Sequence, residues 1–282
     1  MVESPDFLAI GHVTKDLLSD GGFAVGGTVT YASLTAHSLG LSVAVLTSAP
    51  RDLELSCLLP GIDLHIVDSA VATTFENIYE GERRQQFVHS TASPLRASHL
   101  PRAWKQASIV LLGPLVGELG LDWLGEFPDA LVGVTPQGWM RKWESNGRVA
   151  SKPWLEAERI LSSVDVLVFS QEDVAGDQEL IRQYTEMARI AVVTRGRGGA
   201  TVFWNGSTRR FPAFCAREVD PTGAGDVFAA AFLVRLKETN DPYEAAAFAN
   251  CTASFAIEGS GTTTIPSRQQ VEARLRCGQL YE

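Results

Sequence analysis

The sequence has few cysteines and no long hydrophobic run, and each absence excludes a class of protein. The four cysteines, Cys57, Cys215, Cys251 and Cys277, stand far apart without CxxC spacing. This spacing indicates neither a disulfide framework nor a zinc site. No apolar run reaches the roughly 18 residues of a membrane span. The N-terminal MVESPDFLAI has no cationic region followed by an apolar stretch. We therefore expect a soluble cytoplasmic protein with no membrane partner.

Positive charge is also scarce. The chain has 24 Lys and Arg against 33 Asp and Glu, a formal net charge of -9. Surfaces that bind nucleic acid normally show clustered Lys and Arg, so we expect no nucleic-acid partner. With 282 residues, 45% of them hydrophobic, the chain can bury the core of one large domain. It shows no repeat, low-complexity tract or linker, so we predict a single domain over residues 1–282.

Short apolar runs, each followed by a polar or glycine-rich loop, recur along the chain. Such runs are typical of buried parallel strands, and they cover residues 7–10, 43–46, 109–112, 131–134, 164–169 and 191–193. Helical patterns lie between them, the clearest from Thr28 to Leu39 before a stop at Gly40. The alternation predicts an α/β fold with a doubly wound, mostly parallel sheet flanked by helices. In such folds ligands bind beyond the carboxyl ends of the strands.

One segment, TTFENIYEGERRQQFVHST, departs from this alternation. Thr73, Phe75, Asn77 and Tyr79 stand at alternating positions, before a charged turn through Gly81 and a returning strand. We predict a small β lid outside the main sheet, formed by about residues 14–27 and 72–91.

The residues of this hairpin leave two interpretations open. It is either a simple edge hairpin or a lid whose Phe75, Asn77 and Tyr79 face covers a ligand. The protein is accordingly a monomer or a homodimer through the lid, and exposure of Phe75 and Tyr79 would favour the dimer.

The stretch EVDPTGAGDVF predicts a helix start with unusual chemistry. Pro221 keeps the residue before it extended, so we predict that Thr222 caps the helix. Gly223, Ala224 and Gly225 then offer backbone N–H groups with almost no side chain above them. Together with the helix dipole they form a candidate anion hole.

Asp226 follows this hole directly, and two roles fit it. Its charge could simply favour the helix dipole. Alternatively, it is a base that takes the proton of a hydroxyl as that hydroxyl attacks a phosphorus atom held by the amides.

The wider string DPTGAGDVF resembles the C-terminal signature of the ribokinase-like, or phosphofructokinase B, carbohydrate kinases. The resemblance implies a ribokinase-like fold with a β lid, ATP as phosphoryl donor and Mg²⁺ as cofactor, and it leaves room for a monovalent cation. It also implies that Asp226 is the general base and that Gly223, Ala224 and Gly225 hold the transferred phosphoryl group.

Two N-terminal stretches resemble the same family. IGHVTKD fits a Gly-x-x-x-x-Asp pattern in which the aspartate, here Asp16, binds substrate hydroxyls. Gly26 and Gly27, followed by Thr28 as a predicted helix cap, resemble the glycine pair beside which a sugar lies. Without the resemblance, Asp16 is an ordinary turn residue and the glycines close a loop onto a helix.

The stretch VVTRGRGGATVFW resembles the Thr-x-Gly-x-x-Gly loop on the nucleotide side, through Thr194, Gly196 and Gly199. A dinucleotide motif would need a helix after the glycines, but a hairpin turn at Asn205-Gly206 follows. Asn250 is expected near the adenine, on a helix capped by Asp241 and Pro242 whose small residues would let the ring lie flat. Close helix packing explains those small residues equally well.

The chain also departs from the family pattern. The Asn-x-x-Glu expected at the end of a central strand is replaced by Ser170, Gln171, Glu172 and Asp173, which leaves Asp173 as the candidate metal residue. Val29, Thr30 and Tyr31 follow the glycine pair where many sugar kinases place a polar residue, which argues against a simple ribokinase.

Two further segments, TPQGWMR and TTFENIY, resemble those of inositol kinases. A neutral polyol suits Asp16, Asn77 and Gln137 as hydrogen-bond partners, with Arg141 in reach of substrate or phosphate. We therefore predict an ATP-dependent kinase for a hydroxyl of a sugar or cyclic polyol, with myo-inositol favoured. The alternatives are a nucleoside kinase of the same fold and a non-catalytic protein that binds nucleotide or sugar for regulation.

Overall fold

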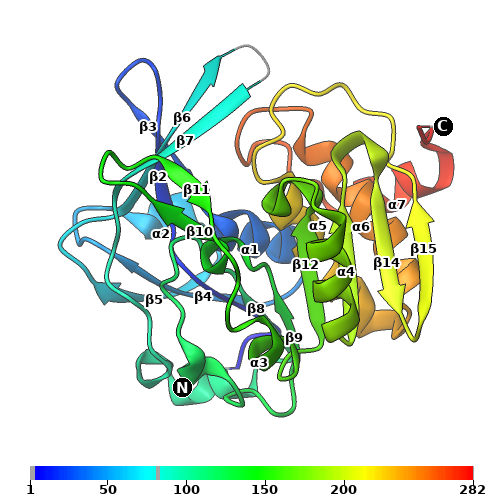
Figure 1. Ribbon diagram of the computed structural model, residues 1–282, viewed down its shortest axis with the longest axis horizontal. Helices are drawn as coiled ribbons and strands as arrows, with labels where there is room; N and C mark the ends of the chain where they lie inside the picture. The colour runs from blue at the N-terminus through cyan, green and yellow to red at the C-terminus, as the bar shows by residue number, and fades with distance from the viewer. Residues whose placement is uncertain (1–3, 81–82, 282) are drawn as a thin grey trace.

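The computed structural model of the chain describes residues 4–80 and 83–281, and the side chains of residues 79, 80, 83 and 84 lie outside that description. A main sheet runs through the middle of the molecule in the order β15-β14-β13-β12-β9-β8-β1-β4-β5 (Figure 1). Its strands are β1 (Phe7–Ile10), β4 (Val43–Ala49), β5 (Asp63–Asp68), β8 (Ile109–Leu112), β9 (Leu131–Val134), β12 (Val166–Ser170), β13 (Ile190–Thr194), β14 (Ala200–Trp204) and β15 (Ser207–Phe211). Only the pairs β13–β14 and β14–β15 are antiparallel among the described strands of this sheet.

Helices cover both faces of the main sheet because its strands are apolar on both sides. In β1, Phe7 and Ala9 join one core cluster while Leu8 and Ile10 join the other. The first cluster is covered by α1 (Thr28–Ser38), α5 (Ala224–Thr239), α6 (Pro242–Ala256) and α7 (Arg268–Cys277). The second is covered by α3 (Ala157–Leu161), α4 (Gln178–Met187) and 3₁₀ segments, and a short α2 spans Leu55–Leu58. The 3₁₀ segments are η1 (Ala97–His99), η2 (Arg102–Gln106), η3 (Leu121–Trp123), η4 (Gln137–Trp139), η5 (Gln171–Val174) and η6 (Gly196–Gly198).

These elements confirm the predicted fold class. All six predicted strands are present, with β12 beginning at Val166 instead of Val164. Helix α1 ends at Ser38, and Gly40 takes the left-handed φ of 96° that stops it. Asn205 and Gly206 both have positive φ and join β14 to β15, as in a tight hairpin.

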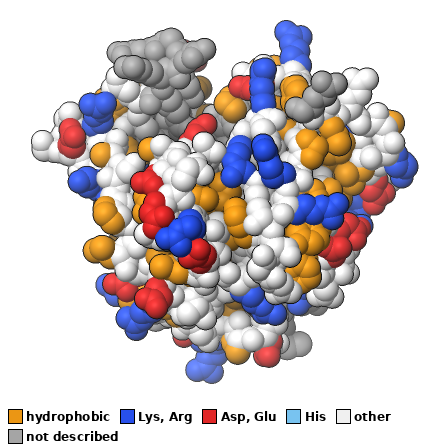
Figure 2. Space-filling model, turned by 45° about the vertical axis from the view of Figure 1, so that its right-hand side comes forward, with side chains coloured by type: hydrophobic (Ala, Val, Ile, Leu, Met, Phe, Trp, Pro, Cys, Tyr) orange, Lys and Arg blue, Asp and Glu red, His pale blue; other side chains and the backbone are white. Residues whose placement is uncertain are grey.

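None of the described helices combines the length and the apolar character that crossing a lipid bilayer requires. On the face shown in Figure 2, basic and acidic side chains are interspersed instead of gathered by sign.

A second sheet stands off the main sheet at the upper left of Figure 1. It has the order β3-β2-β6-β7, with β2 (Thr14–Leu17), β3 (Phe23–Gly26), β6 (Thr73–Glu80) and β7 (Arg83–Ser90), and we call it the lid sheet. Beside it lies a two-stranded ribbon of β10 (Arg141–Trp143) and β11 (Val149–Ser151). The turn expected at Gly81 lies outside the described residues. That the sheet acts as a lid remains a prediction.

The two faces of the lid sheet differ in exposure. Phe75 is only 3% exposed and packs with Val88 and Leu115, so this residue does not meet the condition that would favour a dimer. The exposed apolar residues lie on the opposite face, where Leu17 and Ile78 are 39% and 40% exposed. Buried and exposed residues alternate because neighbouring side chains along a strand point to opposite faces of the sheet. The side chain of Tyr79 lies outside the described residues.

A buried histidine fixes the base of the lid sheet to the main sheet. His12 follows β1, and its Nε2 donates to the carbonyl of Ser93 at 3.0 Å, just after β7. Its Nδ1 accepts from the hydroxyl of Thr73, the first residue of β6, at 2.7 Å. The backbone N–H of His12 donates to the buried carboxylate of Glu118 at 3.1 Å. One side chain therefore anchors the entry and the exit of the β6–β7 hairpin.

Candidate active site

The first turn of α5 holds the residues of the candidate anion hole. Gly223, with a left-handed φ of 78°, caps this helix, which begins at Ala224. The predicted cap at Thr222 was therefore wrong by one residue. The cause is a local turn, in which the N–H of Thr222 donates to Oδ1 of Asp220 at 2.9 Å. A side chain at Gly223 would also lie 2.3 Å from the ring of Tyr31.

Two amides of this turn have no hydrogen-bond acceptor among the described residues. Ala224 N–H donates to the carbonyl of Pro221 at 3.2 Å, and Asp226 N–H donates to that of Gly223 at 3.0 Å. Within the described residues, the N–H groups of Gly223 and Gly225 donate to no carbonyl or side chain. A Cβ added to Gly225 would have no atom within 4 Å. The hole is thus open to an incoming anion, at the positive end of a 16-residue helix.

Asp226 lies where several charged groups converge. The pKa of this carboxyl is raised to about 6, chiefly by burial and also by the nearby negative charges of Asp173 and Asp16. A hydrogen bond from the Thr28 hydroxyl and the positive charge of Arg141 act in the opposite direction and lower the pKa. These effects show that the structure brings together four of the predicted site residues, which come from α5, η5, the lid sheet and β10.

Thr28 has a different place from the one predicted for it. Gly27, with φ 92° and ψ 150°, caps α1, and Thr28 is the first residue of the helix. Its hydroxyl binds Asp226 instead of capping its own helix. A Cβ at Gly27 would lie 2.5 Å from the carbonyl oxygen of His12, so only glycine lets the two segments approach this closely.

Asp16 projects from β2 beside Gly26 of β3. The hydroxyl of Thr14 donates to its Oδ1 at 3.0 Å. A Cβ at Gly26 would lie 2.2 Å from its Oδ2. Gly26 therefore provides the space that this carboxylate occupies.

Gln137 and Asp173 lie together across the carboxyl ends of β9 and β12. Gln137 Nε2 donates to Asp173 Oδ1 at 3.1 Å, and the backbone N–H of Ser170 donates to Asp173 Oδ2 at 2.8 Å. Both carboxylate oxygens thus accept hydrogen bonds. In the described part of the chain no group of three or more His, Cys, Asp or Glu could hold a metal ion. The residues fit a Mg²⁺ held mainly by phosphate oxygens and water, with Asp173 as an outer partner.

The predicted donor loop begins where β13 ends, next to β12. Thr194 pairs with Ser170 across these strands, and Gly196 has a left-handed φ of 51°. A Cβ at Gly199 would lie 2.0 Å from the carbonyl oxygen of Phe211, so the loop packs tightly on the chain after β15. Whether these residues bind a nucleotide stays a prediction.

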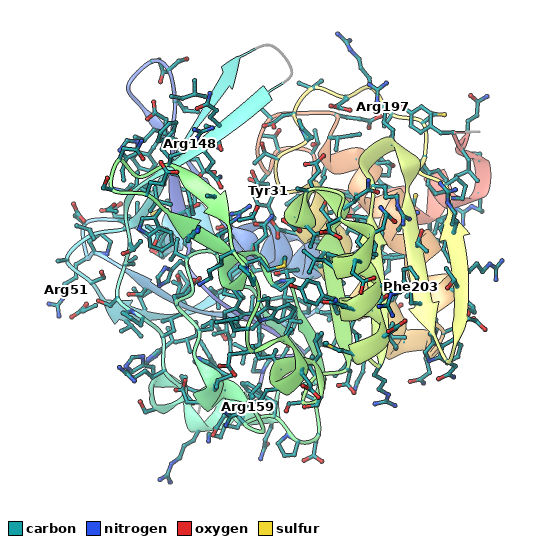
Figure 3. All side chains as sticks on the ribbon, in the orientation of Figure 1. Tyr31, Arg51, Arg148, Arg159, Arg197 and Phe203 are labelled. Carbon is teal, nitrogen blue, oxygen red and sulfur yellow. The ribbon has the colours of Figure 1, made fainter. Side chains whose placement is uncertain are left out.

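Arg197, in the same loop, is labelled in Figure 3 at the top of the α5 side of the molecule. Its Nε donates to Glu218 at 3.4 Å, on the segment that leads into α5.

Asn250 lies in the interior of the protein. It is 6% exposed, and its Nδ2 donates to the carbonyls of Phe211 and Pro212 at 3.1 and 3.3 Å. Ala245, Ala246 and Ala249 on the same helix are fully buried. Helix packing therefore accounts for these small residues and for the amide, while a contact of Asn250 with adenine stays a prediction.

Sequence reasoning missed Tyr31 and the bond made by Thr28. Burial raises the pKa of Tyr31, and the negative charges of Asp16, Asp226 and Asp220 raise it further. Figure 3 shows Tyr31 in the middle of the molecule, between the lid sheet and α5. Their position in the sequence could have identified both residues, because they lie in the first turn of α1, directly after the glycine pair.

Asn77 lies on β6 of the lid sheet. Its Oδ1 accepts a hydrogen bond from Nε2 of Gln86 on β7 at 3.1 Å. Gln86 is a further residue that the sequence did not single out.

Comparison with known proteins matches the family described as pfkB carbohydrate kinases to residues 154–269, which include the first turn of α5. A cytidine kinase from Thermococcus kodakarensis is 26% identical over 254 residues, covering 81% of this chain and 87% of the relative. An inositol 3-kinase from Oryza sativa is also 26% identical, covering 91% of this chain and 69% of the relative.

A solved structure has the same arrangement of elements. It is a pyrophosphate-dependent kinase in the ribokinase family, complexed with a pyrophosphate analog and myo-inositol. Its TM-score is 0.80 at 26% identity, covering 95% of this chain and 99% of that one.

Proposed function

We propose that this chain, which belongs to the ribokinase-like family of pfkB carbohydrate kinases, phosphorylates a hydroxyl of a sugar or cyclic polyol. One observation carries the proposal. The first turn of α5 sets the Asp226 carboxylate beside the open amides of Gly223 and Gly225. A base next to an anion hole is the arrangement that transfer of a phosphoryl group to a hydroxyl requires.

The reaction is a displacement at phosphorus. The acceptor hydroxyl donates its proton to Asp226 as its oxygen forms a bond to the terminal phosphorus of the donor. The bond between that phosphorus and the bridging oxygen breaks, and the remainder of the donor leaves with the negative charge. The amides of Gly223 and Gly225 stabilise the charge on the transferred group. When bound, Mg²⁺ neutralises charge on the donor phosphates, with Asp173 orienting its water ligands.

The pKa of Asp226 suits this role. With a pKa of about 6, the group is mostly ionised at neutral pH and can accept a proton. It is also a stronger base than an ordinary exposed aspartate because its pKa is raised, while that pKa stays below neutral pH.

The acceptor is a neutral polyhydroxyl compound, with myo-inositol favoured. Asp16, Asn77 and Gln137 supply hydrogen-bonding groups, and Arg141 adds a cation near Asp226. Polar groups built for hydroxyls reject ligands that lack them. Similarity to the rice inositol 3-kinase and to a structure that contains myo-inositol supports this choice.

The donor is ATP, bound through Thr194, Gly196 and Gly199 at the end of β13. Pyrophosphate is the second candidate, because the similar solved structure is of a pyrophosphate-dependent kinase. For the acceptor, the second candidate after a polyol is a nucleoside, because a cytidine kinase matches over most of the chain.

A substrate matrix tests the proposal. The full chain is incubated with Mg²⁺ and either ATP or pyrophosphate, and with myo-inositol, ribose, fructose, cytidine or adenosine. Phosphorylated products are identified by ³¹P NMR, with Asp226→Asn as the control. We expect ATP and myo-inositol to give the highest rate, and no product above background from the control. Nucleotide binding by thermal shift without any product would instead support the non-catalytic interpretation.

The oligomeric state has its own test. Leu17, Phe23 and Ile78 are each about 40% exposed and lie on the outer face of the lid sheet. This face supports a homodimer through the lid. Sedimentation of the wild type as a dimer and of Phe23→Asp as a monomer would support it, while a monomeric wild type would contradict it.

A further inference from the structure

Thr135 carries a buried hydroxyl that has no hydrogen-bond partner within the described part of the chain. The residue directly follows β9 and is 7% exposed. Its Oγ1 is the one hydroxyl oxygen among the described side chains that is both sealed from solvent and unpaired. A hydroxyl buried in this way costs free energy, so its presence in a folded protein needs an explanation. Because the oxygen is sealed, a partner has to come from a neighbouring side chain.

The Thr135 side chain lies on the face of the main sheet that packs against α5. A Cβ added to Gly133 would lie 2.7 Å from the side chain of Leu233 on α5. Side chains two residues apart along a strand point to the same face, so Thr135 points to this side as well. The unpaired hydroxyl is therefore on the side of the sheet where the helix that carries Asp226 lies.

The neighbours of Thr135 in the sheet offer its hydroxyl no side-chain partner. On the β12 side, the register places Val168, an apolar residue, next to Thr135. On the β8 side, the register places Gly113 there. A Cβ added to Gly113 would lie 3.5 Å from Thr135 Oγ1. The hydroxyl thus faces the space that a side chain at Gly113 would occupy.

Thr28 fills this space from α1. A Cβ added to Gly113 would lie 2.9 Å from the Cβ of Thr28 and closer still to its Cγ2. The methyl group of Thr28 and the hydroxyl of Thr135 therefore face the same point, while the Thr28 hydroxyl binds Asp226. A turn of about 120° about the Cα–Cβ bond of Thr28 would bring its hydroxyl to that point instead. Threonine in a helix populates two such rotamers.

We propose that Thr135 is a positioning residue that acts through Thr28, as the second partner of the Thr28 hydroxyl. The Thr28 hydroxyl donates to Asp226 while that carboxylate is ionised, and it turns to Thr135 once Asp226 has taken the proton of the acceptor. This inference rests on the proposed function and adds a residue that stabilises the protonated form of the base.

The change of partner follows from the strengths of the two hydrogen bonds. A bond to an ionised carboxylate is roughly twice as strong as one between neutral groups. While Asp226 is ionised, its bond with Thr28 outweighs the free energy lost at the unpaired Thr135 hydroxyl. After Asp226 gains a proton, both bonds open to Thr28 join neutral groups, and the one to Thr135 also satisfies a sealed hydroxyl. The proton stays on Asp226 until it is released to solvent after the transfer.

Other charged and titratable groups from α1, β2, β10 and η5 also face Asp226. They are Tyr31, Asp16, Arg141 and Asp173. A substitution at Thr135 leaves all of these groups in place. A change in the pKa of Asp226 in such a variant therefore reports the link through Thr28.

Thr135→Val tests the proposal, because it replaces the hydroxyl with a methyl group of similar size. Thermal stability should be equal or higher, since an unpaired hydroxyl is removed from the interior. The protonated form of Asp226 loses a stabilising contact, so the pKa of Asp226 should fall. The titration midpoint is measured by ¹³C NMR on protein labelled at the aspartate carboxyl carbons, and Asp226→Asn identifies the signal. The midpoint should fall by roughly 0.5 pH unit or more, a change of about threefold in the acid dissociation constant.

The same variant should move the acidic limb of the kcat/KM profile to lower pH, measured with Mg²⁺, ATP and myo-inositol or with the pair that the substrate matrix selects. Thr135→Ser keeps the hydroxyl and should match the wild type. Thr185→Val is the control, because Thr185 is a buried threonine on α4 whose hydroxyl donates to the carbonyl of Arg182 at 3.0 Å. It should leave the Asp226 midpoint unchanged. If Thr135→Val does not fold, Thr135→Ala takes its place.

The double variant Thr28→Val/Thr135→Val distinguishes an action through Thr28 from a direct one. It should titrate like Thr28→Val alone, because the two residues act as one unit. A wild-type midpoint in Thr135→Val, or additive shifts in the double variant, would overturn the inference while leaving the proposed function intact. A wild type that phosphorylates no acceptor would overturn the proposed function and the catalytic part of this inference. The two failures are distinct because the NMR titration needs no substrate.

Discussion

The hydroxyl of Thr28 donates a hydrogen bond to the carboxylate of Asp226, and this bond joins the first turn of α1 to the first turn of α5. The glycine pair before α1 and the anion hole before α5 are thus held in one unit. Under the proposed function, this contact joins the acceptor site to the donor site.

Removing that bond should alter the pH dependence of the enzyme. The bond lowers the pKa of Asp226, so Thr28→Val should raise it above about 6. The base is active only when ionised, so the acidic limb of the kcat/KM profile should move to higher pH. A hydrogen bond to a charged group contributes about 1.5–3 kcal/mol, so activity at pH 6 should fall roughly tenfold or more. Thr28→Ser should restore the wild-type profile. Superimposable profiles for Thr28→Val and the wild type would contradict this role.

Asp226→Asn should separate catalysis from stability. Turnover should fall by about 10²–10⁴, because no base then accepts the hydroxyl proton. Thermal stability at pH 7.5 should be equal or higher. Burial helps to raise the pKa of Asp226 from 3.8 to about 6 in the folded state. Above pH 6 the folded protein therefore holds an ionised carboxylate in a site that disfavours its charge, which lowers the free energy of unfolding. The neutral amide in Asp226→Asn removes this cost. Calorimetry checks the stability, and a variant that melts well below the wild type would show that the charge is needed for folding.

Gly223→Ala and Gly225→Ala form a matched pair within the anion hole. The first places a Cβ 2.3 Å from the Tyr31 ring at a φ of 78°, and should lower the free energy of unfolding by about 1–3 kcal/mol. The second meets no atom within 4 Å, so it should fold like the wild type. Its methyl group would lie in the proposed anion hole, so the donor KM should rise. Urea unfolding and donor titrations distinguish the two, and equal stabilities would contradict the contact with Tyr31.

Gly26→Ala should affect the acceptor and not the donor. The new Cβ would lie 2.2 Å from Asp16 Oδ2, so the carboxylate must move. The acceptor KM should rise by roughly tenfold or more while the donor KM stays unchanged. Gly22→Ala is a control for the adjoining turn, because Gly22 does not have a left-handed φ and its Cβ would meet only the exposed side chain of Asp20, at 3.2 Å. A donor KM that rises together with the acceptor KM would show a general distortion instead.

The sequence predicted the main sheet well because its signals are local. The strand at Phe7–Ile10 follows from a short apolar run, and the turn at Asn205 follows from the backbone preference of Asn-Gly. The open helix start before Asp226 was also predictable, since Gly223 to Asp226 are consecutive, while its role as an anion hole stays a prediction.

Contacts between distant segments were not predictable in the same way. The bond between Thr28 and Asp226 and the ring of Tyr31 under Gly223 depend on how α1 packs against α5. Helix caps were missed by one residue at both sites because glycines with positive φ replaced the expected threonine caps. A rule that assigns threonine to the cap considers only its own helix. It does not take into account that the Thr28 hydroxyl bonds to Asp226 on α5 instead.

The anchoring by His12 gives the β6–β7 hairpin two defined ends at which it could be exchanged. Its two ends are fixed at Thr73 and Ser93, so the segment between them begins and ends at defined points in space. A hairpin from a relative could be grafted between these two residues without redesigning the sheet below. We expect such chimaeras to take their acceptor preference from the grafted hairpin, while the first turn of α5 still comes from this chain.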